Sequence, residues 1–202
     1  MAGQSIAYRT INEIAERLVN NPVNYRVGWV VDALGASLFL RLGLGAPGSW
    51  MASAAAALAG LIAWGFVEYA LHRWLGHGPP SFARRGHAHH HSNDAALIAA
   101  PIFAVLIGAF TVWAVLSLIV PGGVASLLVF GLYVGYNYYG LLHHLLHHHE
   151  AFAVRIGLQR LEHVHSIHHG LQTVNFGVTT TLWDRVLGTY QAPVFRARRD
   201  RS

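Results

Sequence analysis

The stretch VASLLVFGLYVGYNYYGLLHHLLHHH, residues 124–149, decides the fold, because an uncharged apolar run leads directly into a cluster of histidines. A helix needs about 20 mostly apolar residues to cross a bilayer. Residues 124–142 meet this requirement, and the histidines begin where the apolar run ends. The stretch therefore predicts a membrane-spanning helix that carries histidines at one end.

Three other segments, residues 27–46, 50–69 and 96–120, are also apolar enough to cross a bilayer. Hydrophobic residues make up 53% of the 202 residues and charged residues only 11%, against about 25% charged in soluble domains. Tight turns, GAPGS at 45–49 and PGG at 121–123, join the segments in pairs. We therefore expect an all-α integral membrane protein with four transmembrane helices in two hairpins.

The chain is expected to form one membrane-embedded domain over residues 1–202. Residues 1–26 place isoleucines at helical spacing among charged side chains, which predicts an interfacial helix and not a signal peptide. Residues 191–202 form a basic tail of the kind that sets topology at an anionic membrane surface. Arginine is absent from both tight turns, so the positive-inside rule places both termini and all the histidines in the cytoplasm.

The composition excludes several classes of site. The chain has no cysteine, so it forms no disulfide, thiolate zinc site or iron–sulfur cluster, and histidine must bind any transition metal. Its net charge of +5 comes from arginine, yet no dense basic stretch interleaved with aromatic residues occurs before the tail. We therefore expect no nucleic-acid partner.

Histidines lie in four clusters: HRWLGH at 72–77, HAHHH at 87–91, HHLLHHH at 143–149 and HSIHH at 165–169. Residues at i, i+3 and i+4 share a helix face. This spacing selects His87, His90 and His91; His165, His168 and His169; and His143 and His147. The last pair has a competitor, because His144 and His148 have the same spacing, and both choices remain open.

The pair His72 and His77 is spaced differently. Residues at i and i+5 point about 140° apart on an ideal helix, so we expect the helix to loosen here, helped by Gly76. Ten imidazoles in all are too many for one ion. Two ions with about five nitrogen ligands each, and room for oxygen or water, predict a dinuclear centre in a cytosolic helical cap, although imidazole suits iron, zinc, copper and nickel alike.

Other polar residues are assigned around this centre. Glu68 lies one turn before His72 and is expected to orient an imidazole, and Asp94 and Asp184 are further candidates. The remaining histidines are expected to lie off the metal-binding faces: His89, His144, His148, His149 and His163. For Asp32, inside the first span, a helix-packing hydrogen bond and a position near the cytoplasmic surface both remain open.

Over about residues 64–190 the chain resembles the fatty acid hydroxylase and sterol desaturase superfamily of membrane histidine-cluster oxygenases. The residues that carry the resemblance are EYALHRWLGH at 68–77, HxxHH at 87–91 followed by SND, YGLLHHLLHHH at 139–149, HSIHH at 165–169 and NFGVTTTLWDRVLGTY at 175–190. In this family the last stretch closes the domain beside the metal site, and Asn175 and Asp184 stand in matching places.

The resemblance implies a monooxygenase that uses two iron ions and O2 to hydroxylate or desaturate a membrane lipid. The implied iron ligands are His72, His77, His87, His90, His91, His143, His147, His165, His168 and His169. Electrons are expected from an external ferredoxin or cytochrome b5 with its reductase, because no fused cytochrome b5-like domain is present. The aromatic residues Trp64, Phe66, Tyr133, Tyr136, Tyr138 and Tyr139 are candidates to line a substrate channel or to pack the helices.

The HHSND and NFG…LWD…GT patterns favour a fatty acyl or sphingoid substrate. Only nine residues separate His77 from His87, and this short spacing keeps a sterol or carotenoid substrate as the alternative. Outside the oxygenases, a membrane metal transporter would place ionisable residues near the bilayer midplane, and haem iron takes only one or two axial histidines. Both classes fit the clusters less well.

Overall fold

The computed structural model describes residues 6–193, which form helices and connecting loops without a strand. The helices are α1 (Ile6–Val19), α2 (Pro22–Leu44), α3 (Trp50–Ala70), the π-helix η1 (Leu71–Gly76), α4 (Phe82–Ser92), α5 (Ile102–Ser117), α6 (Gly122–His148), α7 (Glu150–Arg155), α8 (Gln159–Leu171) and α9 (Leu182–Val186). The all-α prediction is therefore confirmed for this part of the chain. Most of the predicted basic tail lies outside the described residues.

Three helical segments in this part are long and apolar enough to cross a membrane: α2, α3 continued through η1, and α6. The fourth expected span, residues 96–120, contains the shorter helix α5 of 16 residues. At 1.5 Å per residue α5 is about 24 Å long, less than the roughly 30 Å of a bilayer core. Residues 93–101, which precede α5, form no helix, and Pro101 disfavours helix in the residue before it.

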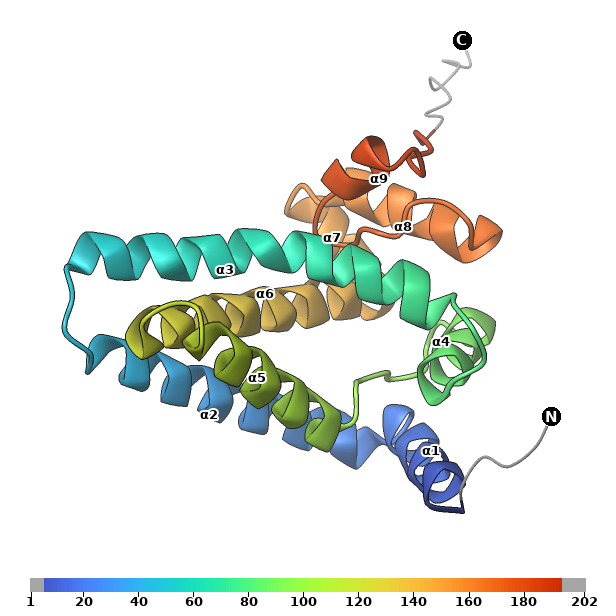
Figure 1. Ribbon diagram of the computed structural model, residues 1–202. Helices are drawn as coiled ribbons and strands as arrows, with labels where there is room; N and C mark the ends of the chain where they lie inside the picture. The colour runs from blue at the N-terminus through green and yellow to red at the C-terminus, as the bar shows by residue number, and fades with distance from the viewer. Residues whose placement is uncertain (1–5, 194–202) are drawn as a thin grey trace, which may run out of the picture.

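Helix α6 lies at the centre of the bundle, with α3 along one side and α2 along another (Figure 1). Glycines let α3 and α6 approach closely. A Cβ on Gly60 would lie 2.0 Å from the carbonyl oxygen of Leu128, and a Cβ on Gly131 would lie 2.0 Å from that of Ala57. Because backbone occupies both places, these two positions exclude every larger residue without a shift of the helices.

The variant Gly131→Ala is expected to destabilise the protein by about 1–3 kcal/mol, the usual cost of overpacking a close-packed contact. Thermal unfolding in detergent measures this loss. Gly108→Ala on α5 is the matched control, because a Cβ there meets no atom within 4 Å, and alanine favours a helix over glycine. Equal melting temperatures for the two variants would contradict the close approach of α3 and α6.

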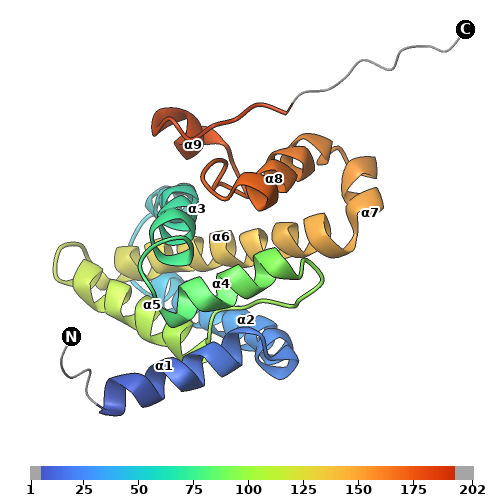
Figure 2. The same ribbon diagram turned by 90° about the vertical axis from the view of Figure 1, so that its right-hand side faces the viewer.

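At the end of the bundle where α3 passes into η1 and where α6 ends lie α1, α4, α7, α8 and α9 (Figure 1). Helix α1 runs beside α4 (Figure 2), and Arg85 of α4 donates to Glu16 of α1 at 2.6 Å. All four histidine clusters lie on helices at this end or directly after them, so the fold brings together residues almost 100 positions apart in the chain.

Candidate metal centre

The π-helix η1 places the first two histidines. The backbone N–H of His77 donates to the carbonyl oxygen of His72 at 3.1 Å, which is the i to i+5 bond of a π-turn. A Cβ on Gly76 would lie 3.2 Å from the His87 ring, so glycine leaves room for the imidazoles. The predicted loosening of the helix between His72 and His77 is confirmed.

Ten histidines form two groups of five, and within each group the ligand nitrogens all lie within 4.8 Å of one another. The first group is His72, His77, His87, His91 and His168, and the second is His90, His143, His147, His165 and His169. Helix α4 contributes to both groups, since His87 and His91 lie in the first and His90 in the second. The groups therefore lie side by side, with the His91 and His169 ring centroids 4.3 Å apart.

The hydrogen-bond partners of His72 and His168 show which ring nitrogens of the first group can bind a cation. The Nδ1 of His72 donates to the Phe176 carbonyl at 2.5 Å, and the Nδ1 of His168 donates to the Val174 carbonyl at 2.8 Å. A neutral imidazole with a protonated Nδ1 has a bare lone pair on Nε2. Both lone pairs therefore point into the group.

The Nε2 atom of His87 lies among the Nε2 atoms of three other imidazoles. It lies 2.9 Å from the Nε2 atoms of His72, His77 and His91. One nitrogen carries at most one hydrogen, so these three contacts cannot all be hydrogen bonds. Converging lone pairs repel one another unless a cation lies between them, and the first group therefore fits a metal ion.

The second group has the same character. His147 Nε2 lies 3.1 Å from His90 Nε2 and 2.8 Å from His165 Nε2. The Nδ1 of His169 donates to the Asp94 carboxylate at 2.9 Å, which leaves its buried Nε2 as a lone pair without a hydrogen-bond partner. A buried acceptor without a partner is costly in a dry site, so this group also fits a metal ion.

Burial keeps these imidazoles neutral. Loss of hydration, with smaller contributions from neighbouring imidazoles, lowers the pKa of His90 to about 2 and that of His168 to about 3. Burial also lowers the pKa of His77 and of His91 to about 4. The neutral form of imidazole is the form that binds metals. At neutral pH the ligands therefore need no deprotonation before they bind an ion.

The structure shows which of the two histidine pairs with i, i+4 spacing on α6 lies in a metal-binding group. His143 and His147 point into the second group, whereas His144 faces the hydroxyl of Tyr25 at 2.9 Å and stacks on His148. The five histidines expected to lie off the metal-binding faces are outside both groups in the described part of the chain.

Among the carboxylates expected to orient a ligand, Asp94 contacts an imidazole of the two groups, that of His169. The variant Asp94→Ala removes the acceptor for His169 Nδ1, and metal affinity of the second group is expected to fall by about 10–100-fold. Metal titration with iron or zinc measures this loss, and Asp94→Asn should retain much of the affinity because its amide oxygen still accepts.

Glu162→Gln is the matched control for this prediction, because Glu162 pairs with His163, which lies outside both groups, at 2.7 Å. Equal losses of affinity in Asp94→Ala and Glu162→Gln would show that the Asp94 contact has no specific effect on the ligand.

Glu68 has a different contact from the expected one. Its carboxylate accepts from the backbone N–H groups of Val178 and Thr179, at 2.5 and 2.9 Å, and from the Thr179 hydroxyl. Glu68 therefore fixes the backbone after Phe176, and its effect on His72 passes through that backbone. A carboxylate one turn before a histidine was not sufficient to predict a contact with the ring.

Asp184 and Asn175 hold the same backbone segment. Asp184 accepts from the N–H groups of Phe176 and Gly177, at 2.7 and 2.8 Å, and from the Thr189 hydroxyl at 2.8 Å. Asn175 has a left-handed backbone with φ of 55°, and its side chain donates to the carbonyl groups of Val164 and Gln191. Both residues thus position the carbonyl groups that accept from the imidazoles.

The acceptors themselves, the carbonyl oxygens of Val174 and Phe176, were missed by sequence reasoning. Every residue has such a carbonyl, so no side chain signals its use. Hydrogen bonds from Asn175 and Asp184 hold this segment beside His72 and His168, where its carbonyl oxygens fix the tautomer of each ring.

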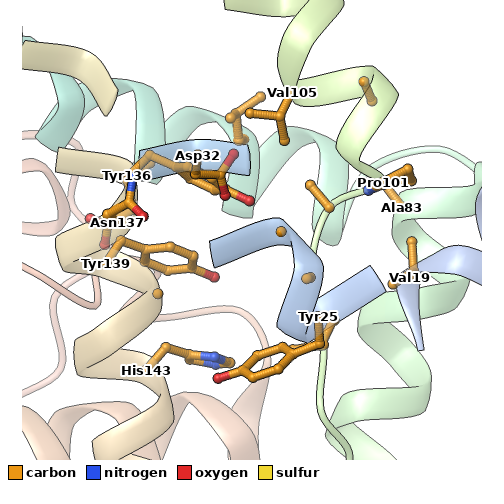
Figure 3. Close-up of a pocket in the computed structure, with 18 of the residues that line it drawn as sticks. Val19, Tyr25, Asp32, Ala83, Pro101, Val105, Tyr136, Asn137, Tyr139 and His143 are labelled. Carbon is orange, nitrogen blue, oxygen red and sulfur yellow. The ribbon is translucent and has the colours of Figure 1, made fainter. Parts of the chain in front are cut away.

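A cavity of about 660 Å³ lies beside the histidines, between α2, α5 and α6 (Figure 3). Histidines from both groups line it: His72, His87, His90, His143 and His147. Four of the expected aromatic residues line it as well, namely Trp64, Tyr133, Tyr136 and Tyr139. Phe66 instead packs on Trp183 with ring centroids 4.7 Å apart, and Tyr138 is 47% exposed.

Comparison with known proteins agrees with this site. Residues 57–189 match the family described as fatty acid hydroxylase. The dihydroceramide fatty acyl 2-hydroxylase FAH2 of Arabidopsis thaliana is 30% identical over 139 residues, which cover 64% of this chain and 58% of that protein. The fatty acid 2-hydroxylase of Rattus norvegicus is 32% identical over 140 residues, which cover 62% of this chain and 36% of that protein.

A solved structure of full-length scs7p, with only its hydroxylase domain visible, shares the fold with a TM-score of 0.65 and 24% identity. The alignment covers 82% of this chain and 67% of that chain. This chain spans 58% or less of the two sequence relatives named above. Since the family match includes all four histidine clusters and most of the chain, the chain belongs to the fatty acid hydroxylase family.

Proposed function

We propose that this chain is a di-iron lipid hydroxylase that inserts one oxygen atom of O2 into a C–H bond of a fatty acyl or sphingoid lipid. The observation that carries the proposal is that both five-imidazole groups open onto one largely apolar cavity. The balanced reaction converts C–H, O2, two electrons and two protons into C–OH and water. The electrons come from an external ferredoxin or cytochrome b5 with its reductase.

The ten imidazoles would hold two iron ions, five to each, and bound iron supplies the redox chemistry that activates O2. The protein's own contribution is to fix the ligands. The Val174 and Phe176 carbonyls and the Asp94 carboxylate accept from Nδ1 of His168, His72 and His169. Each of these contacts directs a lone pair on Nε2 toward the proposed ion.

The cavity determines which molecules reach the centre. Its apolar walls exclude water and fit a hydrocarbon chain, and confinement orients one C–H bond toward the histidines. The names of the relatives, fatty acid and dihydroceramide fatty acyl 2-hydroxylases, support an acyl or sphingoid lipid over an isoprenoid.

We further propose that α2, α3 with η1, and α6 span the membrane within a single domain, and that α1 lies at the interface. The arginine pattern supports a cytoplasmic location for the histidine end, where a soluble electron donor has access.

Lipid analysis tests the activity. Lipid extracts from cells with and without the chain, grown aerobically with a competent reductase, are compared by mass spectrometry. A species heavier by one oxygen is expected, and it should persist with His89→Ala, an exposed histidine outside both groups. A species lighter by two hydrogens would instead support the desaturase alternative, and the absence of any new species would contradict the proposed function.

A further inference from the structure

Two buried polar atoms, one on α2 and one on α6, belong to residues that line the cavity and have no hydrogen-bond partner among the described residues. One is the Oδ1 of Asp32 on α2, a residue only 6% exposed, and the other is the hydroxyl oxygen of Tyr133 on α6, a residue 4% exposed. Both residues line the 660 Å³ cavity. Figure 3 shows the Asp32 carboxylate beside Tyr136 and Asn137 at the cavity wall.

The two atoms lie close to the same part of α2. A Cβ on Gly35 would lie 2.9 Å from the Tyr133 hydroxyl oxygen. Gly35 follows Asp32 by three residues, so the two share a helix face. The Cβ positions of residues 32 and 35 are about 5–6 Å apart, so the carboxylate and the hydroxyl lie at adjacent turns of one face of α2.

Helix packing does not account for this pair. The amide of Asn137, which Figure 3 also draws near Asp32, donates instead to the Tyr133 carbonyl of its own helix at 2.8 Å. The unpaired Oδ1 does not support the packing hydrogen bond for that oxygen, and a position near the cytoplasmic surface of the membrane stays a prediction. A buried carboxyl without a partner is costly, and such a group in a cavity points to a ligand.

The pair lies about two to three turns along α6 from the metal-binding histidines. Helices α2 and α6 run antiparallel, with Tyr25 opposite His144 and Phe39 stacked on Tyr133. His143 of the second group follows Tyr136, which lies beside Asp32, by seven positions on α6. At 1.5 Å per residue this separation is about 10 Å.

We propose that Asp32 and Tyr133 form a hydrogen-bonding subsite for a hydroxyl group on the chain of the lipid substrate. A hydroxyl both donates and accepts, so it donates to Asp32 Oδ1 and accepts from the Tyr133 hydroxyl. A plain hydrocarbon chain would leave both atoms unpaired. The inference rests on the proposed function and narrows its substrate to lipids that carry a hydroxyl about 10 Å from the carbon that reacts.

Binding of two matched probes, stearic acid and its 10-hydroxy derivative, tests the subsite. The iron-loaded full chain in detergent receives no electron donor, so turnover does not enter. Each probe displaces dibromostearic acid, whose bromines quench tryptophan fluorescence, and Trp29 and Trp64 line the cavity. The wild type is expected to bind the hydroxylated probe about tenfold more tightly, which corresponds to a modest net gain from each of the two buried hydrogen bonds.

Asp32→Leu and Tyr133→Phe are each expected to bring this affinity ratio close to one, mainly by weakening the hydroxylated probe. Ser37→Ala is the matched control, since Ser37 is on α2, bonds to the Ala33 carbonyl and does not line the cavity. It should keep the tenfold ratio. If Asp32→Leu does not fold, Tyr133→Phe, which removes a single oxygen atom, carries the test.

Equal affinity of the wild type for both probes would overturn the subsite and would indicate that water satisfies Asp32 and Tyr133. A tenfold ratio that survives in both cavity variants would overturn it as well. Failure of the wild type to bind either probe has a different meaning, because it would contradict a lipid-binding cavity and with it the proposed function.

Discussion

Replacing one ligand in each group, with the double variant His90→Ala and His168→Ala, is expected to abolish stoichiometric iron binding. The wild type prepared with iron should contain about two ions per chain, one for each group of five imidazoles. His90→Ala alone should lose the ion of the second group, and His168→Ala alone that of the first. Removal of a direct ligand should weaken binding by more than about 100-fold, the upper end of the effect of an outer partner.

Metal analysis of the purified variants, combined with lipid mass spectrometry, checks this expectation. His89→Ala is the matched control, because His89 is exposed on α4 and belongs to neither group. It should retain both ions and the oxygenated lipid. A wild type with clearly fewer than about two ions, or a double variant with unchanged occupancy, would contradict the dinuclear centre.

The second large effect is expected from Asp184→Ala. Asp184 is fully buried and accepts three hydrogen bonds, from Phe176, Gly177 and Thr189. Its removal leaves the two buried backbone donors of Phe176 and Gly177 unpaired and takes one partner from the Thr189 hydroxyl, and a loss of about 3–5 kcal/mol in the free energy of unfolding is expected. Metal occupancy of the first group should fall too, because the displaced Phe176 carbonyl no longer accepts from His72.

Thermal unfolding in detergent and metal content measured on the same sample separate the two effects. Glu150→Ala removes an exposed carboxylate at the start of α7 and should change neither quantity. Asp184→Asn keeps one acceptor oxygen and should be intermediate. A destabilised Asp184→Ala that still binds two ions would show that the segment around Phe176 supports the fold without positioning His72.

Much of this site was predictable because helix geometry is local. Because a helix has 3.6 residues per turn, histidines at i, i+3 and i+4 lie on one face, and this rule alone selects the two three-histidine sets. The same period predicts that His72 and His77, at i and i+5, would point apart on an ideal α-helix. The π-helix η1 lets both side chains join the first group. Apolar length predicted three membrane-competent helices, and failed only for α5, where Pro101 delays the helix start.

The competing pairs on α6 show the limit of local geometry. His143/His147 and His144/His148 have identical spacing, and only the rotation of α6 against α4 and α8 decides which pair meets the second group. Glu68 shows the same limit, since its partners Val178 and Thr179 lie more than 100 residues away. Nothing in the sequence near Glu68 specifies them.

By itself the sequence determined an all-helical chain, the ten histidines and their division into faces, because each of these follows from residue type and helical period. The tertiary structure decided how the ten imidazoles divide into two groups of five, which carbonyls fix their tautomers, and that Asp32 and Tyr133 remain unpaired in one cavity. These features depend on the relative position and rotation of whole helices. Many weak packing contacts set that arrangement together, and no single stretch of sequence encodes it.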